Sequence, residues 1–281
     1  MILIADSGST KTQWCIVDHK SVSTRFETIG LNPFFVDTNV VIDTIKRKIS
    51  TYKDSIKSVY FYGAGCSGPV TNEIIYNGIS RVLPKAEIKI YSDILGAAHA
   101  LFGNDEGIAV ILGTGQSTCH YKNEEILFRL PSTGFILGDE GSGANLGLRL
   151  LKAYIHHELP EKISKKLSDK YQMNLDAIKK EVYTGQFPNR YLASFAPFVY
   201  ENRSIPEIKK IIEDSFNDLF NKYILKYPEI EKLKIGFVGS VAFYFKDFLT
   251  NIAAEKKLKI HHIIQSPIDV LIKYHLKGIS T

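Results

Sequence analysis

The sequence predicts an α/β protein with two mixed β-sheets, each flanked by helices, and three observations lead to this prediction. The chain opens with apolar stretches joined by short turns, which is typical of antiparallel strands. Stretches typical of strands and of helices then alternate, which favours parallel strands added to the same sheet. The same order of elements restarts after the turn-forming cluster at 104–107.

The first part of the chain carries one set of strands and helices. The opening apolar run ends on Asp6 and is joined by a small-residue turn to the next run, which predicts a hairpin. We expect Thr38 to cap a helix whose apolar residues share one face. Another helix should follow Gly68, and a third should start at Asp93. The expected strands cover residues 2–5, 14–17, 22–28, 58–62 and 87–91.

The second part of the chain repeats this opening. A strand, a glycine turn at 113–117 and two further strands lead into a helix expected at about 144–157. Residues 160–230 are mostly helical in pattern, and the clearest helix opens at Ser204 with Pro206 near its start. A helix should begin at Val241, and a short one at Ser266-Pro267. The expected strands cover residues 108–112, 118–121, 126–130, 234–238 and 258–264. We therefore expect lobes at 1–105 and 106–265.

Composition narrows the class of protein. The 281 residues are 44% hydrophobic and 23% charged, as in ordinary globular proteins. The net charge is +5, but no basic tract is interleaved with aromatic residues, so no nucleic-acid partner is expected. No apolar run is long enough to predict a membrane span, and the first residues do not resemble a signal peptide. Three dispersed cysteines fit reduced thiols, so we expect a cytoplasmic protein.

Several expected strands end on small or acidic residues. In open α/β sheets, ligands bind beyond the carboxyl ends of the strands. Two glycine turns that offer N–H groups could clamp a polyphosphate, with Thr10 adding a hydroxyl, Lys11 a charge and Asp6 a ligand for a divalent metal. An ordinary polar turn explains the opening hairpin equally well when it is taken alone. The strand-end segments are 6–10, 63–68, Asp93, 113–117 and 239–240.

Separated motifs in a fixed order carry a resemblance to a known family. The segments at 6–12 and 112–115 are similar to its two phosphate motifs, 92–97 to the segment with the catalytic acid, and 238–241 to the adenosine motif. The stretch 137–143, which contains GDEGSG, is the most specific. The sequence resembles the sugar kinase/Hsp70/actin superfamily. Within it, the sequence is similar to the N-acetylglucosamine kinase branch, the BadF/BadG/BcrA/BcrD-type ATPase family.

The resemblance implies a fold and an activity. The fold would be two RNase H-like lobes of the actin-like ATPase type around a central cleft, with the last helix at about 266–281 packing on the first lobe. The activity would be transfer of the γ-phosphate of ATP, with Mg²⁺, to the 6-hydroxyl of an amino sugar, N-acetylglucosamine being favoured. Asp93 would be the general base. A homodimer is also expected.

The resemblance assigns further residues to ligands. Asp6 would help to hold Mg²⁺. The residues implied in sugar binding are Asn32, Asp93, Gln116, Ser117, Thr133, Gly134, Phe135 and Asp139. The residues implied in ATP binding are Gly8, Ser9, Thr10, Lys11, Gly113, Thr114, Gly115, Gly239 and Ser240. Thr133 stands where the family usually has Trp, and Gln116 where Ser is common, which leaves the identity of the sugar open.

Alternatives remain at this stage. Asp93 and Asp139 could simply cap helices. The 63–68 turn matches a dinucleotide fingerprint, but a lone match is weak, and we interpret it as a turn on the sugar side. A related ATPase could drive a partner enzyme through a cysteine-ligated iron–sulfur cluster, although Cys15 and Cys66 form no matching pair. A sensor of sugar or nucleotide without catalysis is the third possibility.

Overall fold

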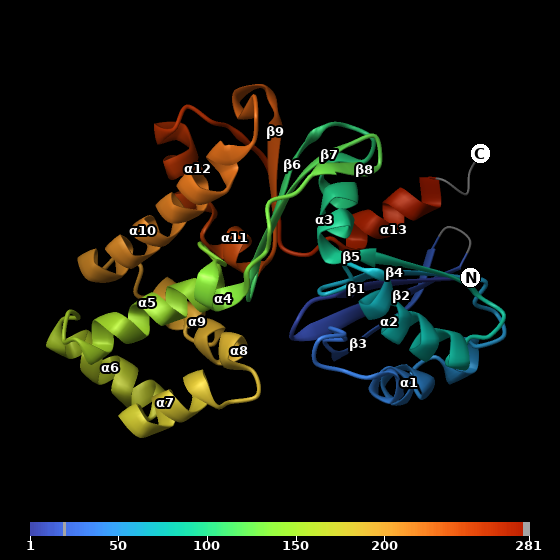
Figure 1. Cartoon of the computed structure of the whole chain (residues 1–281), viewed down its shortest axis with the longest axis horizontal. Helices are drawn as coiled ribbons and strands as arrows, with labels where there is room; N and C mark the ends of the chain where they lie inside the picture. The colour runs from blue at the N-terminus through green and yellow to red at the C-terminus, as the bar shows by residue number, and fades with distance from the viewer. Residues whose placement is uncertain (19–20, 278–281) are drawn as a thin grey trace. The chain divides into compact units, whose positions relative to one another are not determined.

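The computed structural model describes residues 1–18 and 21–277, and the chain divides into two compact units. Unit 1 comprises Met1–Asp105, Lys122–Ile126 and the chain from Ser266. Unit 2 comprises Glu106–Tyr121 and Leu127–Gln265. Each unit contains one five-stranded sheet (Figure 1).

The sheet of unit 1 has the strand order β3-β2-β1-β4-β5. Its first three strands are antiparallel, and β1, β4 and β5 are parallel, which confirms the expected mixed sheet. The register aligns Ser7 with Gly63 and Gly63 with Ser92, so β1, β4 and β5 end at one edge. The strands are β1 Ile2–Ser7, β2 Lys11–Asp18, β3 Ser21–Ile29, β4 Ser58–Gly63 and β5 Glu87–Ser92.

Helices cover both faces of this sheet (Figure 1). Side chains alternate along a strand, so Leu3 and Ala5 of β1 pack with α1 and α2, whereas Ile4 packs with α13. The helices of unit 1 are α1 Thr38–Lys46, the short 3₁₀ turn η1 Ser50–Tyr52, α2 Pro69–Val82, α3 Asp93–Phe102 and α13 Ile268–Lys277.

The sheet of unit 2 has the order β10-β9-β6-β7-β8. Strand β6 pairs antiparallel with β7 and parallel with β9, and β9 pairs parallel with β10. This arrangement matches the strand order of unit 1, as the restarted sequence pattern predicts. The strands are β6 Gly107–Leu112, β7 Gln116–Lys122, β8 Glu125–Phe128, β9 Lys234–Val238 and β10 Ile260–Ile264.

Most of unit 2 outside the sheet is helical, as expected for 160–230. Helix α10 buries an apolar face, including Ile212, Phe216 and Phe220, in the main core of this unit. The helices are α4 Gly134–Leu137, α5 Gly143–Ile155, α6 Glu161–Tyr171, α7 Leu175–Tyr183, α8 Pro188–Ala193, α9 Ala196–Glu201, α10 Pro206–Lys222, η2 Ile224–Lys226, η3 Ile230–Lys232, α11 Ser240–Tyr244 and α12 Lys246–Glu255.

Element boundaries differ from the expectations in several places. The cap of α1 is Asp37, whose side chain accepts from Val40 N, so the assignment of the cap to Thr38 is wrong. Helix α10 begins after Ile205, not at Ser204, and the helix expected from Val241 is two helices that meet at Phe245.

Two expectations concern which unit a segment joins. Residues 122–126 were expected in the second lobe but group with unit 1, where the Tyr274 hydroxyl of α13 donates to Glu124 Oε1 at 3.1 Å. Helix α13 packs against β1 and β2, while residues 278–281 of the expected last helix lie outside the described residues. No helix in the described ranges combines the length and hydropathy needed to cross a membrane.

Candidate functional site

The carboxyl end of β1 leads into a tight exposed turn in unit 1. Gly8 N donates to Lys11 O at 2.9 Å and closes the turn, so Ser9 and Thr10 lie at its tip. The Lys11 ammonium pairs with Glu27 at 2.8 Å, and both side chains are largely exposed. Exposed pairs contribute little to stability. Lys11 is therefore available to exchange Glu27 for a phosphate at small cost.

Two carboxylates interact near the edge formed by β1, β4 and β5. The pKa of Asp6 is raised to about 7, first by loss of hydration and then by the negative charge of Asp93, while Lys11 lowers it. A divalent cation would relieve both of the effects that raise this pKa. Mg²⁺ commonly uses one or two protein carboxylates together with phosphate oxygens and water, so these side chains fit it. Groups of three or more His, Cys, Asp or Glu able to hold a metal are absent from the described residues.

Asp93 is the first residue of α3 and does not serve as its cap. The cap is Ser92, whose backbone is extended and whose hydroxyl accepts from Leu95 N at 3.4 Å. Asp93 Oδ1 accepts from Ile94 N at 2.8 Å. An anion at the start of a helix is stabilised by the helix dipole. The dipole of α3 therefore favours a negative charge at this position, and the Asp93 side chain is partly exposed.

The loop that carries Asn32 packs on the glycine turn after β4. Asn32 is buried, its side-chain oxygen accepts from Phe34 N at 3.0 Å, and Leu31 N donates to Ser7 Oγ at 3.0 Å. Gly65 has φ +81°, and a Cβ there would lie 2.4 Å from Asn32 Oδ1. Ala64 N donates to Ser7 O at 2.8 Å. These contacts bring Asn32, the glycine turn and the end of β1 together.

In unit 2, the glycine turn at 113–115 contacts the start of α5. Gly143 N and Ala144 N donate to the carbonyls of Gly113 and Thr114 at 2.8 and 3.1 Å. This turn also contacts Asp139, since a Cβ on Gly115 would lie 3.0 Å from its Oδ2. The expected phosphate turn and the GDEGSG loop are thus neighbours.

Asp139 is buried and bound to the start of β7. Its Oδ1 accepts from Gln116 N at 3.0 Å. Burial raises its pKa to about 6, the Gln116 N–H opposes this shift, and Glu140 adds to it. The cap of α5 is Ser142, whose hydroxyl accepts from Asn145 N, so Asp139 is not the cap. The ionised carboxylate of Asp139 is thus destabilised by burial, and capping of α5 does not explain why a carboxylate lies at this position.

The remaining residues expected at the sugar lie around Asp139. Thr133 and Gly134 are exposed, whereas Phe135 packs partly against the core of unit 2. Gln116 and Ser117 are buried at the start of β7. The Ser117 hydroxyl accepts from Arg129 at 3.5 Å. No local sequence pattern links Arg129 to β7, so this contact could not be expected from the sequence.

The adenosine motif lies beside the glycine turn of unit 2. Gly239 has φ +127°, and a Cβ there would lie 2.2 Å from Leu112 O, so only glycine fits. Gly239 N donates to Ile264 O at 3.0 Å, and Ser240 begins α11. The ends of β6, β9 and β10 therefore meet at this residue.

Comparisons with known proteins agree on the fold. A candidate N-acetylglucosamine kinase from Porphyromonas gingivalis is 38% identical, with a TM-score of 0.95, 99% of this chain covered and 100% of that one. A similar candidate from Chromobacterium violaceum is 17% identical, with a TM-score of 0.73 and 97% and 98% covered. A ROK family glucokinase from Streptomyces griseus, solved with glucose and AMPPNP, is 13% identical, with a TM-score of 0.56 and 97% of each chain covered. The chain has the actin-like ATPase fold of sugar kinases.

The family follows from the match along the chain. The model of the BadF/BadG/BcrA/BcrD ATPase family matches residues 5–272, and the chain belongs to this family. An N-acetylmuramic acid/N-acetylglucosamine kinase from Clostridium acetobutylicum is 28% identical over an alignment of 163 residues that covers 53% of this chain. That match spans about half of the relative, 51% of its length. The family expected from the motifs is thus confirmed.

Proposed function

We propose that the protein is an ATP-dependent kinase that transfers the γ-phosphate to an amino sugar, with the 6-hydroxyl of N-acetylglucosamine as the favoured acceptor. The observation that carries the proposal is the edge of unit 1 where β1, β4 and β5 end in register. Asp6 lies one residue before the end of β1, Asp93 follows β5, and the loop that carries Asn32 contacts the end of β1 through Leu31 N and Ser7 Oγ. In unit 2, Asp139 and two nucleotide motifs are likewise neighbours. The relatives from P. gingivalis and C. acetobutylicum support the choice of sugar.

Each group has a defined part in the proposed reaction. Asp93 accepts the proton of the attacking hydroxyl, which makes the oxygen a better nucleophile. Asn32 and Asp139 hydrogen-bond the sugar and orient it, with the 132–135 segment and the start of β7 beside them. The turns at 8–11 and 113–115 offer N–H groups to phosphates, and Gly239-Ser240 borders the nucleoside. Mg²⁺, held with the help of Asp6, would neutralise phosphate charge.

The test is a coupled assay of ADP release with ATP and Mg²⁺. The panel is N-acetylglucosamine, glucosamine, N-acetylmannosamine, N-acetylmuramic acid and glucose, and we expect the strongest response to N-acetylglucosamine. Asp93→Asn should lower turnover about 10²- to 10⁴-fold, the usual range for losing a general base. The matched control is Asp43→Asn on the exposed side of α1, which should leave turnover unchanged.

Each result of this assay has a clear meaning. Wild-type turnover in Asp93→Asn would refute the assignment of the base. A flat response to every sugar would refute the kinase, and slow ADP release without sugar would then favour an ATPase that drives a partner, as the family name allows. Phosphorus NMR of the product identifies the hydroxyl that carries the phosphate.

The proposed activity also bears on the location of the protein, its partner and its oligomeric state. A kinase of this kind works where ATP is made, so we propose a cytoplasmic location and a small-molecule acceptor as its partner. We also propose a homodimer, which sedimentation equilibrium would test. A single species of 31.6 kDa would contradict the dimer.

A further inference from the structure

The last turn of α10 lies against the loop that carries Asp139. A Cβ on Gly141 would lie 3.0 Å from Leu219 Cδ2, and one on Gly138 would lie 2.6 Å from the Tyr223 hydroxyl. Lys222 Nζ lies 2.9 Å from Glu140 Oε1. Positions 219, 222 and 223 share one helix face, because they are three and four residues apart. One face of α10 thus contacts the loop on both sides of Asp139.

The loop needs such support because its backbone is unusual. Asp139 has φ +59° and Gly141 has φ +79°. A residue other than glycine persists in the left-handed region only where its surroundings determine the conformation. This conformation presents the Asp139 carboxylate to Gln116 N. The contacts with α10 therefore bear on where this carboxylate lies.

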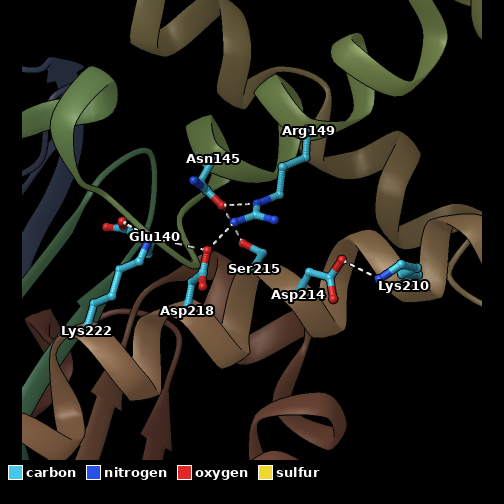
Figure 2. Close-up of polar contacts among 8 residues, drawn as sticks. All are labelled: Glu140, Asn145, Arg149, Lys210, Asp214, Ser215, Asp218 and Lys222. Atoms are coloured by element: carbon cyan, nitrogen blue, oxygen red, sulfur yellow. Dashed lines mark hydrogen bonds and ion pairs between the residues drawn. The ribbon is translucent and has the colours of Figure 1, made fainter. Parts of the chain in front are cut away.

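Lys222 is held between two carboxylates, as Figure 2 shows. Glu140 has a side chain that is only 10% exposed, and Asp218 lies 3.4 Å from the same ammonium. Asp218 also pairs with Arg149 of α5. Asn145, near the start of α5, accepts from Arg149 Nε at 2.8 Å and from Ser215 Oγ of α10 at 2.7 Å. The network ties α10 to the helix that follows the loop, so Lys222 approaches Glu140 from a fixed position.

We propose that Lys222 is a positioning residue for the sugar-binding carboxylate Asp139, acting through its ion pair with buried Glu140. This inference rests on the proposed function, because it takes Asp139 to bind the sugar. The geometry carries it, since Glu140 is the next residue after Asp139 and Lys222 is the cation that meets it. Helix α10, which comes from the stretch at 160–230, would thereby set the affinity for the sugar.

The charge of Lys222, like its position, favours an ionised Asp139 carboxylate held in place. Glu140 raises the pKa of Asp139, and the Lys222 ammonium offsets the negative charge of Glu140. The Tyr223 hydroxyl also faces this pair, and its pKa is raised by burial and by Glu140, so it stays neutral near pH 7. Without Lys222, the negative charge of Glu140 would no longer be offset, so it would raise the pKa of Asp139 further.

The test compares variants of Lys222 with a matched control on the same helix. Lys222→Met should raise the KM for N-acetylglucosamine about tenfold at pH 7, the equivalent of one weakened ionic contact, and more at pH 6. The KM for ATP should stay within about twofold, and Lys222→Arg should restore the KM for sugar. Lys210→Met removes a similar lysine, which pairs with exposed Asp214 at 2.8 Å (Figure 2), and should change nothing.

A second variant addresses the cost of leaving a buried charge unpaired. The Glu140 side chain is only 10% exposed, although that of Lys222 is 53% exposed, so Lys222→Met leaves a buried charge without this partner and could fail to fold. Glu140→Gln with Lys222→Met removes both charges and keeps similar shapes. If the ion pair holds the loop in place, this double variant folds but still shows a raised KM for sugar that depends less on pH.

A readout without catalysis separates this inference from the proposed function. Gln116 N–H donates to Asp139, so the exchange rate and NMR shift of this amide report whether the carboxylate is in place. We expect exchange about tenfold faster in Lys222→Met or in the double variant, and a wild-type rate in Lys222→Arg and Lys210→Met. An unchanged Gln116 amide, or an unchanged KM for sugar, would overturn the inference. A changed amide with no sugar phosphorylated would refute the kinase alone.

Discussion

Replacing Asp139 by Asn should stabilise unit 2 while it removes activity on the sugar. The change keeps the size of the side chain and leaves an oxygen that can accept from Gln116 N. It removes a charge that is costly, because Asp139 is 7% exposed and its pKa is raised from 3.8 to about 6. Catalytic and binding sites often store such unfavourable charges.

The size of the effect follows from the pKa. Each pKa unit corresponds to about 1.4 kcal/mol, so the ionised carboxylate costs about 3 kcal/mol above pH 6. The Asp139 carboxyl ionises near pH 3.8 in the unfolded chain, and only near pH 6 in the folded protein. The stability of the wild type should therefore fall as pH rises from about 4 to 6, and Asp139→Asn should lack this fall. The new amide N–H₂ needs partners, so we expect a net gain of about 2 kcal/mol at pH 8.

Scanning calorimetry at pH 4 and pH 8 measures this difference. The single tryptophan, Trp14, is fully buried in unit 1, so its fluorescence follows the other unit and serves as an internal control. We expect the unit 2 transition to move upward by about 5 °C at pH 8, with little change in Trp14 unfolding. Equal stability of the variant and the wild type at pH 8, or the same gain at both pH values, would refute the reasoning.

Two further predictions concern unit 1. The pKa of His275 is lowered to about 4 by burial, and its Nε2 lies 3.0 Å from the Tyr62 hydroxyl, so folding favours the neutral imidazole. The stability of unit 1 should therefore fall as pH drops from about 6.5 towards 4, and His275→Phe should lessen that fall. Urea titrations followed by Trp14 fluorescence measure it, and the same dependence of stability on pH in both proteins would contradict the prediction. Gly65→Ala should cost about 1–3 kcal/mol and raise the KM for sugar, because the new Cβ meets Asn32 Oδ1 at a positive φ. An unchanged KM would separate this turn from sugar binding.

The strands were predictable because their signals are local. Apolar runs that stop at Asp6, Gly63 or Gly113 predict both a strand and the residue near which it ends. The parallel strands of each unit then end at the same edge of their sheet. The mixed sheets follow from this order, since antiparallel strands need only short turns and parallel strands need a helical crossover. Helix starts were less predictable. Ser92 and Asp93 are both good caps, and only the extended backbone of Ser92 decides between them.

The support of the site could not be predicted, because it depends on contacts between distant segments. Glu140 and Lys222 are 82 residues apart, and nothing near either one indicates the other. The fit of Asn32 against Gly65 and the contact of Ser117 with Arg129 are likewise products of the fold. Phe135 was expected at the sugar from the family resemblance alone, and its ring packs partly against the core of unit 2.

The stretch at 160–230 is tied to the site more closely than its sequence indicates. Helix α10 is fixed by buried Ile212, Phe216 and Phe220, and its last turn meets the loop on both sides of Asp139. A core that fixes α10 therefore also fixes the loop, because packed interiors transmit small displacements. A cavity made by mutation in this core would loosen the last turn of α10 and so displace the loop that carries Asp139. If Asp139 binds the sugar as proposed, the affinity for sugar therefore depends on the packing of the helical stretch, whereas the proposed base Asp93 belongs to unit 1, which has its own sheet and its own core.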